Sequence, residues 1–221
     1  IAISGFDLKP RAVADGKLFK RRRGEEIGFD LPTYFAIQKL VLYPQIFTRG
    51  IAAGDVHGDG YPDVLVCGDP NIGGLYLFAN IRGERFVRQE LDLGEFNQKG
   101  IFAGALVDLN NDSWLDIVFT TVDDGNFYLL NREGRFLNSD LRLLSHKRGT
   151  SGLSLGFADF DETGTLDVFV CNYTIGHVGE IHPISHESSR NQILFNRGRL
   201  FEAVDMPSLP GETHGVLVTD F

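Results

Sequence analysis

The sequence lacks an excess of basic residues, a long apolar run and a haem-attachment motif, and each absence argues against a class of protein. The formal net charge of −9 argues against a nucleic-acid partner, because proteins that bind nucleic acids present a basic face. No run of about 18 apolar residues occurs, so no transmembrane segment is expected. The motif C-x-x-C-H is absent, which argues against a c-type haem.

The residues that are present suffice for a core, and the acidic ones are unevenly distributed. Apolar residues make up 43% of the chain and aromatic residues 11%, so one large or two small folded domains are expected. Many carboxylates gather in three nine-residue loops, which we call loop 1 (residues 55–63, DVHGDGYPD), loop 2 (108–116, DLNNDSWLD) and loop 3 (159–167, DFDETGTLD). A bound metal ion is the natural counter-charge for such loops.

The three loops share a spacing of oxygen ligands that suits Ca²⁺. Side chains at positions 1, 3, 5 and 9 and the main-chain carbonyl at position 7 can point towards one ion, and Ca²⁺ takes six to eight oxygens at roughly 2.3–2.6 Å. The candidate ligands are Asp55, Asp59, Tyr61 and Asp63 in loop 1, Asp108, Asn110, Asp112, Trp114 and Asp116 in loop 2, and Asp159, Asp161, Thr163, Thr165 and Asp167 in loop 3. A single loop would be explained equally well by a polar hairpin turn. Three copies that recur about every 50 residues indicate a repeat architecture and favour calcium.

Individual loop positions differ, and the differences predict unequal affinity for calcium. His57 at position 3 of loop 1 is a poor ligand for a hard cation, so this site is expected to be weak or to use water. Asn110 in loop 2 keeps an oxygen without the charge, and Thr163 in loop 3 offers only a neutral hydroxyl. The expected order of affinity is loop 2, followed by loop 3 or loop 1.

The flanking residues exclude an EF-hand, whose loop begins in the same way. An EF-hand needs a bidentate Glu at position 12 and helices on both sides. Position 12 is Val66, Phe119 or Val170 here, within apolar runs that are typical of strands buried on both faces. The loops therefore lie between strands.

Four strands form the repeating unit. In the first unit they are expected at 51–53, 64–67, 75–78 and 85–91, and four short strands joined by tight turns make one antiparallel blade. The expected organisation is an N-terminal segment (1–49), blades at 50–99, 100–149 and 150–211, an insertion at 172–191 and the start of a further blade at 212–221. An Asn, a glycine-containing turn and a Phe recur at 80–86, 131–136 and 196–201, which predicts a hairpin in each unit.

The two cysteines occupy matching places in the first and third units. Cys67 and Cys171 each follow the last aspartate of their loop by four residues. These units should lie well apart, and a disulfide needs Cα atoms within about 7 Å. Two buried free thiols are therefore expected.

Both ends of the sequence suggest a piece of a longer protein. The opening IAISGFDLKP has no charged region or cleavage site of a signal peptide, so a mature or trimmed start is expected. The sequence ends at Asp220-Phe221, which resembles the first residues of loop 3. More repeats are expected beyond it, because a strand left unpaired in mid-loop is a liability.

The insertion at 172–191 is rich in histidine and acidic residues. It contains His177, His182 and His186 together with Glu180 and Glu187. A solvated polar loop is preferred over a transition-metal site, because the spacings fit no common zinc motif. A long loop on a rigid scaffold is nevertheless where a binding surface is expected.

The pattern Gly-x-x-x-Gly-Asp-x-x-x-Asp-Gly-x-x-Asp at 50–63, followed by Cys67-Gly68-Asp69-Pro70, resembles the FG-GAP repeat of integrin α-subunit β-propellers and their bacterial relatives. The hairpins and the insertion look more like the ASPIC/UnbV subgroup, which includes cartilage acidic protein. The likeness covers roughly residues 50–221. It implies an all-β protein, a β-propeller of four-stranded antiparallel blades, commonly seven, with Ca²⁺ in hairpin loops on one face. This chain would supply a little over three blades.

The resemblance implies a non-enzymatic binding, adhesion or scaffold module. The partner would be a protein, a glycan or other subunits of a larger extracytoplasmic assembly. Calcium loops of modest affinity suit a secreted protein in an extracellular or periplasmic setting. Ser151 and Ser154 lie in no recognisable catalytic motif. The alternative is a calcium-dependent, lyase-like enzyme acting on polysaccharides, with His182, His186 or Arg190 as candidate catalytic groups.

Overall fold

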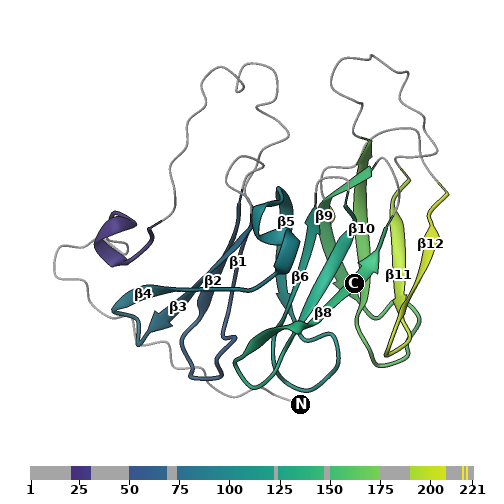
Figure 1. Cartoon of the computed structure of the whole chain (residues 1–221). Helices are drawn as coiled ribbons and strands as arrows, with labels where there is room; N and C mark the ends of the chain where they lie inside the picture. Colours follow the sequence, from purple (N-terminus) through teal and green to yellow (C-terminus); the bar gives the residue numbers. More distant parts are fainter. Residues whose placement is uncertain are drawn as a thin grey trace, which may run out of the picture.

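The computed structural model describes residues 21–30, 50–68, 74–121, 124–146, 150–174, 190–207, 216 and 218. In these residues the fold is all-β, with three four-stranded antiparallel sheets and two short 3₁₀ helices, η1 (Glu25–Ile27) and η2 (Gly94–Gln98) (Figure 1). Each sheet corresponds to one predicted unit, so the expected all-β fold of four-stranded blades is confirmed.

Within each blade the strands pair in sequence order. Blade 1 consists of β1 (Ile51–Gly54), β2 (Asp63–Cys67), β3 (Leu75–Ile81) and β4 (Arg85–Gln89). Blade 2 consists of β5 (Ile101–Val107), β6 (Asp116–Thr121), β7 (Asn126–Asn131) and β8 (Phe136–Ser145). Blade 3 consists of β9 (Thr150–Ala158), β10 (Asp167–Thr174), β11 (Gln192–Asn196) and β12 (Phe201–Asp205).

The second strand of each blade forms its buried centre. Every residue of β6 is buried, and β2 is buried apart from the partly exposed Val64. After their first aspartate these strands consist mainly of β-branched and other apolar residues, which pack well when both faces of a sheet are covered. The loops therefore start and end on well-anchored strands.

The three predicted hairpins are confirmed. Asn80 pairs with Phe86, Asn131 with Phe136 and Asn196 with Phe201, so the same two residues close the third and fourth strands of every blade. A glycine in each turn has the positive φ that a side chain disfavours, as at Gly134 (φ 82°).

The outer strand of blade 2 is longer than the sequence indicates. The sequence predicts this strand only around 135–137, yet β8 continues to Ser145 and includes Leu141, Leu143 and Leu144. Its buried and exposed residues do not alternate regularly, and its pairing with β7 contains two irregularities. The period of two that marks a strand in a sequence is therefore interrupted here.

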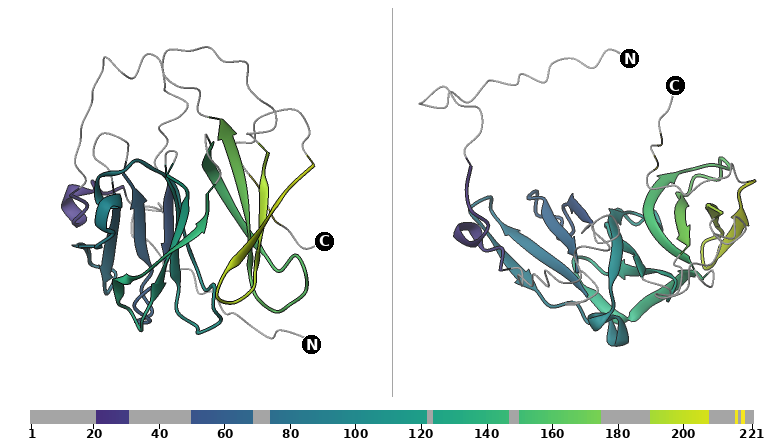
Figure 2. Two further views of the ribbon diagram at one scale, coloured as in Figure 1. Left: turned by 45° about the vertical axis from the view of Figure 1, so that its right-hand side comes forward. Right: turned by 90° about the horizontal axis from the view of Figure 1, so that it is seen from above.

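The blades follow one another in an arc, which is clearest from above (Figure 2). One apolar cluster fills the space between blades 1 and 2 and includes Leu65, Leu77 and Phe119. A second cluster lies between blades 2 and 3 and includes Val118, Val168 and Leu194. Burial of apolar side chains between neighbouring sheets therefore holds the arc together.

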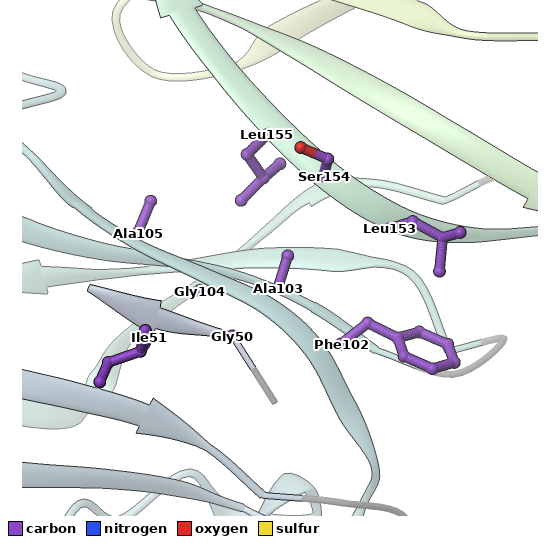
Figure 3. A pocket seen from close by; sticks show the side chains of 9 residues that line it. All are labelled: Gly50, Ile51, Phe102, Ala103, Gly104, Ala105, Leu153, Ser154 and Leu155. Atoms are coloured by element: carbon purple, nitrogen blue, oxygen red, sulfur yellow. The ribbon is translucent and has the colours of Figure 1, made fainter. Parts of the chain in front are cut away.

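Of the inner strands β1, β5 and β9, the first two carry glycines that let blades 1 and 2 approach each other closely. A Cβ on Gly54 of β1 would lie 2.6 Å from Cδ1 of Leu115 in loop 2, and one on Gly104 of β5 would lie 2.8 Å from Sγ of Cys67 in β2. A groove of about 240 Å³ runs along these strands (Figure 3). It is lined by Gly50, Ile51, Phe102, Ala103, Gly104, Ala105, Leu153, Ser154 and Leu155.

Cys67 and Cys171 are free and buried, as expected. Burial raises the pKa of the Cys67 thiol to about 12 and that of Cys171 to about 11, because a thiolate is poorly solvated in the core. Both residues therefore act as small apolar side chains in their strands.

Several expectations fall outside the described residues. They concern most of the N-terminal segment, the three histidines and two glutamates named in the insertion, and the loop that begins at Asp220. No helix in the described part of the chain has the length and apolar character that a membrane crossing needs.

Candidate functional site

Each of the three loops connects the first and second strands of its blade, so all three lie at the same end of the blades. Neighbouring loops are also in direct contact. The side-chain amide of Asn111 in loop 2 donates a hydrogen bond to the carbonyl of Gly164 in loop 3 at 2.8 Å. The predicted ligands thus form a continuous acidic rim along one end of the arc.

The carboxylate at position 1 organises the backbone of every loop. In loop 3, Asp159 accepts hydrogen bonds from the N–H groups of Thr163 at 2.9 Å and Gly164 at 2.7 Å. Asp55 and Asp108 accept the equivalent bonds from positions 5 and 6 of their own loops. These bonds explain why loops with different sequences share one conformation.

The carboxylate at position 9 is buried and holds two parts of the blade together. Asp116 has no exposed surface and accepts hydrogen bonds from the N–H groups of Leu109 at 3.0 Å and Asn131 at 2.8 Å. Asp63 and Asp167 accept the same pair of bonds in their blades. Burial raises the pKa of Asp116 to about 6, and the nearby charges of Asp112 and Asp108 contribute to the increase.

The hairpin asparagines connect consecutive blades. Asn131 donates to the carbonyl of Leu115 in its own loop at 3.0 Å and to the carbonyl of Val56 in loop 1 at 2.8 Å. Asn196 does the same in blade 3, with Leu166 in its own loop and Leu109 in loop 2. The sequence indicates these asparagines only as turn residues, because nothing in it shows which strands become neighbours.

Positions 5 and 7 form a short turn in each loop. The N–H of Tyr61 donates to Asp59 at 3.0 Å, and the N–H of Trp114 donates to Asp112 at 2.9 Å. In loop 3 the hydroxyls of Thr163 and Thr165 lie 3.1 Å apart. These hydrogen bonds therefore hold each position-7 residue, whose carbonyl is a predicted ligand, close to the side chain at position 5.

Loop 3 gathers carboxylates most closely. Oxygen atoms of Asp159, Asp161 and Asp167 all lie within 4.8 Å of one another. Two oxygens on opposite sides of one Ca²⁺ are about 5 Å apart, since each Ca–O distance is roughly 2.3–2.6 Å. The three side chains therefore fit one calcium ion. Within the described residues, the acids of loops 1 and 2 do not form such a group.

Arg197, which follows β11, lies beside loop 3, and the sequence alone does not identify it. Its guanidinium forms an ion pair with Asp161 and a second one with Glu202. The pair with Arg197 lowers the pKa of the Asp161 carboxyl. The equivalent residue of blade 2, Arg132, instead pairs with Asp140 at 2.9 Å. A cation in loop 3 must therefore compete with, or lie beside, the Arg197 guanidinium.

Position 3 of loop 1 is occupied by an imidazole with two partners. Nδ1 of His57 lies 2.7 Å from Oδ2 of Asp63, and Nε2 contacts the side-chain amide of Gln89 at 2.9–3.1 Å. His57, predicted to be a poor ligand for a hard cation, thus takes part in a hydrogen-bond network within blade 1.

The FG-GAP-like repeat family matches the chain twice, over residues 55–119 and 108–170. The first match runs from position 1 of loop 1 to β6, directly after loop 2, and the second runs from position 1 of loop 2 to β10, directly after loop 3. Together they cover just over half of the chain. The chain belongs to the FG-GAP-like repeat family. A comparison with curated proteins found no match.

FG-GAP membership agrees with the three four-stranded blades and with the place of the loops between first and second strands. The predicted FG-GAP resemblance is thereby confirmed, whereas the ASPIC/UnbV subgroup stays a prediction. FG-GAP repeats suggest a β-propeller module for binding or adhesion, and they often bind Ca²⁺.

Proposed function

We propose that this chain is part of a calcium-stabilised, seven-bladed FG-GAP propeller that acts as a non-enzymatic binding or adhesion module outside the cytoplasm. Its partner is a protein, a glycan or another subunit of an extracytoplasmic assembly. The observation that carries the proposal is the group of three carboxylates in loop 3, at one end of three blades built in the same way.

Electrostatics supports a calcium ion in the loops. Asp116 is buried close to Asp112 and Asp108, and its raised pKa reflects the cost of keeping that charge without a counter-ion. A divalent cation would offset this cost by pairing with the carboxylates, and its hard character matches their oxygens. Calcium binding would then stabilise the native state by mass action.

The roles of the aspartates favour a binding module over an enzyme. Position 1 holds the loop backbone and position 9 links the loop to the hairpin asparagine, so these carboxylates are structural. FG-GAP repeat proteins are also generally not enzymes. The rigid rim of loops would instead present a docking surface, which is a common use of loops on a stable scaffold.

Loop affinities of roughly 10⁻⁴–10⁻³ M would match the calcium concentration outside the cytoplasm. This is the physical reason for the proposed extracellular or periplasmic location. At cytoplasmic calcium concentrations such loops would be empty, and the acidic rim would be less stable.

Calorimetric titration of Ca²⁺ tests the proposal directly. Asp161→Asn should remove the binding event of loop 3, because Asp161 belongs to the carboxylate group. Glu162→Gln is the matched control, since it removes the same charge from an exposed neighbour outside that group. Absence of any binding heat at millimolar calcium, or equal behaviour of the two variants, would contradict the calcium site. Turnover of acidic polysaccharides would contradict the non-enzymatic function.

A further inference from the structure

His57 distinguishes loop 1 from the other two loops. Loop 3 has a carboxylate at position 3, Asp161, whose oxygen belongs to the group that fits a cation. Loop 2 has Asn110, which keeps an oxygen. Loop 1 instead places an imidazole there, and nitrogen is a poor ligand for hard cations such as Ca²⁺.

The imidazole also uses one of the other expected ligands of loop 1. Asp63 is 1% exposed, and carboxylate oxygens accept hydrogen bonds, so Nδ1 of His57 is assigned as the donor at 2.7 Å. Asp63 accepts two further bonds, from the N–H groups of Val56 at 3.0 Å and Asn80 at 2.8 Å. Three of roughly four acceptor positions on this carboxylate are thus occupied.

The second ring nitrogen fixes the imidazole in this position. Nε2 contacts the side-chain amide of Gln89 on β4 at 2.9–3.1 Å. The His57 side chain is only 22% exposed, so loop 1 is tied to the outer strand of its own blade. The remaining acidic side chains, Asp55 and Asp59, cannot supply the six oxygens that calcium requires without several waters.

We infer that His57 takes the place of the cation in loop 1, so that this loop is closed by a side chain and needs no calcium. The calcium ions of this chain are then bound by loops 2 and 3. This assignment rests on the proposed function. Blade 1 keeps its loop in the absence of calcium, whereas blades 2 and 3 depend on it.

A count of bound calcium ions separates the loops. Asp59 and Asp112 both stand at position 5 and both accept the N–H of position 7, which makes them a matched pair. By calorimetry the unaltered chain should bind two ions, Asp59→Asn should also bind two, and Asp112→Asn should bind one. Three ions in the unaltered chain, with one lost in Asp59→Asn, would overturn the inference.

Melting experiments test His57 even if no loop binds calcium. His57→Ala should lower Tm by several degrees, and by the same amount in calcium and in chelator, because the lost hydrogen bonds do not involve an ion. An unchanged Tm in chelator would overturn the inference, whereas a chain that binds no calcium at all would refute only the proposed function. His57→Asp should be less stable than the unaltered chain in chelator and should bind one additional ion in calcium. If the unaltered chain binds calcium in loops 2 and 3, no gain of an ion in His57→Asp would show that His57 does not stand in the cation's place.

Discussion

Replacing Asn131 with alanine should destabilise the protein much more than the same change at Asn80. Both asparagines occupy the same place in their blades, at the end of the third strand. Asn131 is 1% exposed, and its side-chain amide links blade 2 to blade 1 through the carbonyl of Val56, a fully buried residue. In the described residues the side chain of Asn80 bonds only within blade 1, to Pro62 and Gly83, and Asn80 is partly exposed.

The magnitude follows from the groups left without partners. Asn131→Ala deprives the buried carbonyl of Val56 of its donor, which costs about 1–3 kcal/mol, and removes bonds to Leu115 and Gly134 worth about 1 kcal/mol or less each. The total is roughly 3 kcal/mol, or a decrease in Tm of roughly 6–12 °C for a chain of this size. Water can replace the partners of Asn80, so Asn80→Ala should cost about 1 kcal/mol.

Differential scanning calorimetry of the two variants measures this difference. Asn196→Ala should behave like Asn131→Ala, because Asn196 makes the same bridge between blades 2 and 3 and is 5% exposed. Equal decreases in Tm for Asn80 and Asn131 would refute the reasoning, since they would show that the bond between blades contributes nothing beyond the hairpin.

Three further changes test the packing, the charge balance and the cation site. Gly104→Ala should destabilise the chain by about 1–3 kcal/mol in urea unfolding, because its Cβ would lie 2.8 Å from Sγ of the buried Cys67 and 3.2 Å from Cδ2 of the buried Leu65; an unchanged midpoint would contradict the close approach. The folded-state pKa of Asp116, about 6, is above the unfolded value, so the native chain binds this proton more tightly and stability falls as pH rises through about 4 to 6. In chelator, the Tm of the unaltered chain should therefore fall more steeply between about pH 4 and 6 than the Tm of Asp116→Asn. The same pH dependence of Tm in both chains would contradict this role of Asp116. Arg197→Ala should tighten calcium binding at loop 3 a few-fold in calorimetry, because it frees Asp161 from its ion pair; weaker binding would show that Arg197 supports the site instead.

The strands and hairpins could be predicted from the sequence because their signals are local. The runs at 64–66 and 117–119 are apolar and β-branched or aromatic, and such runs become central strands wherever both faces are covered. The hairpins follow from an asparagine with a glycine two or three residues later, as at Asn131 and Gly134. Strand β8 lacks a regular alternation of buried and exposed residues, and only its first residues were predicted.

The positions of the three acidic loops could be predicted from the sequence, whereas the contacts of their side chains could not. Spacing alone identifies positions 1 to 9 of each loop, but it does not show that Asp116 is buried and bonded to Asn131. Gln89, one partner of His57, lies 32 residues from it, and Asp161, one partner of Arg197, lies 36 residues from it. Such pairs depend on how strands are placed in three dimensions, and no local pattern in one sequence encodes them.

Anomalous diffraction from crystals grown in calcium would measure the occupancy of each loop directly. The account predicts one ion among Asp159, Asp161 and Asp167 in loop 3, a second in loop 2, and His57 bonded to Asp63 without an ion in loop 1. Loops 2 and 3 without an ion at millimolar calcium would contradict the account.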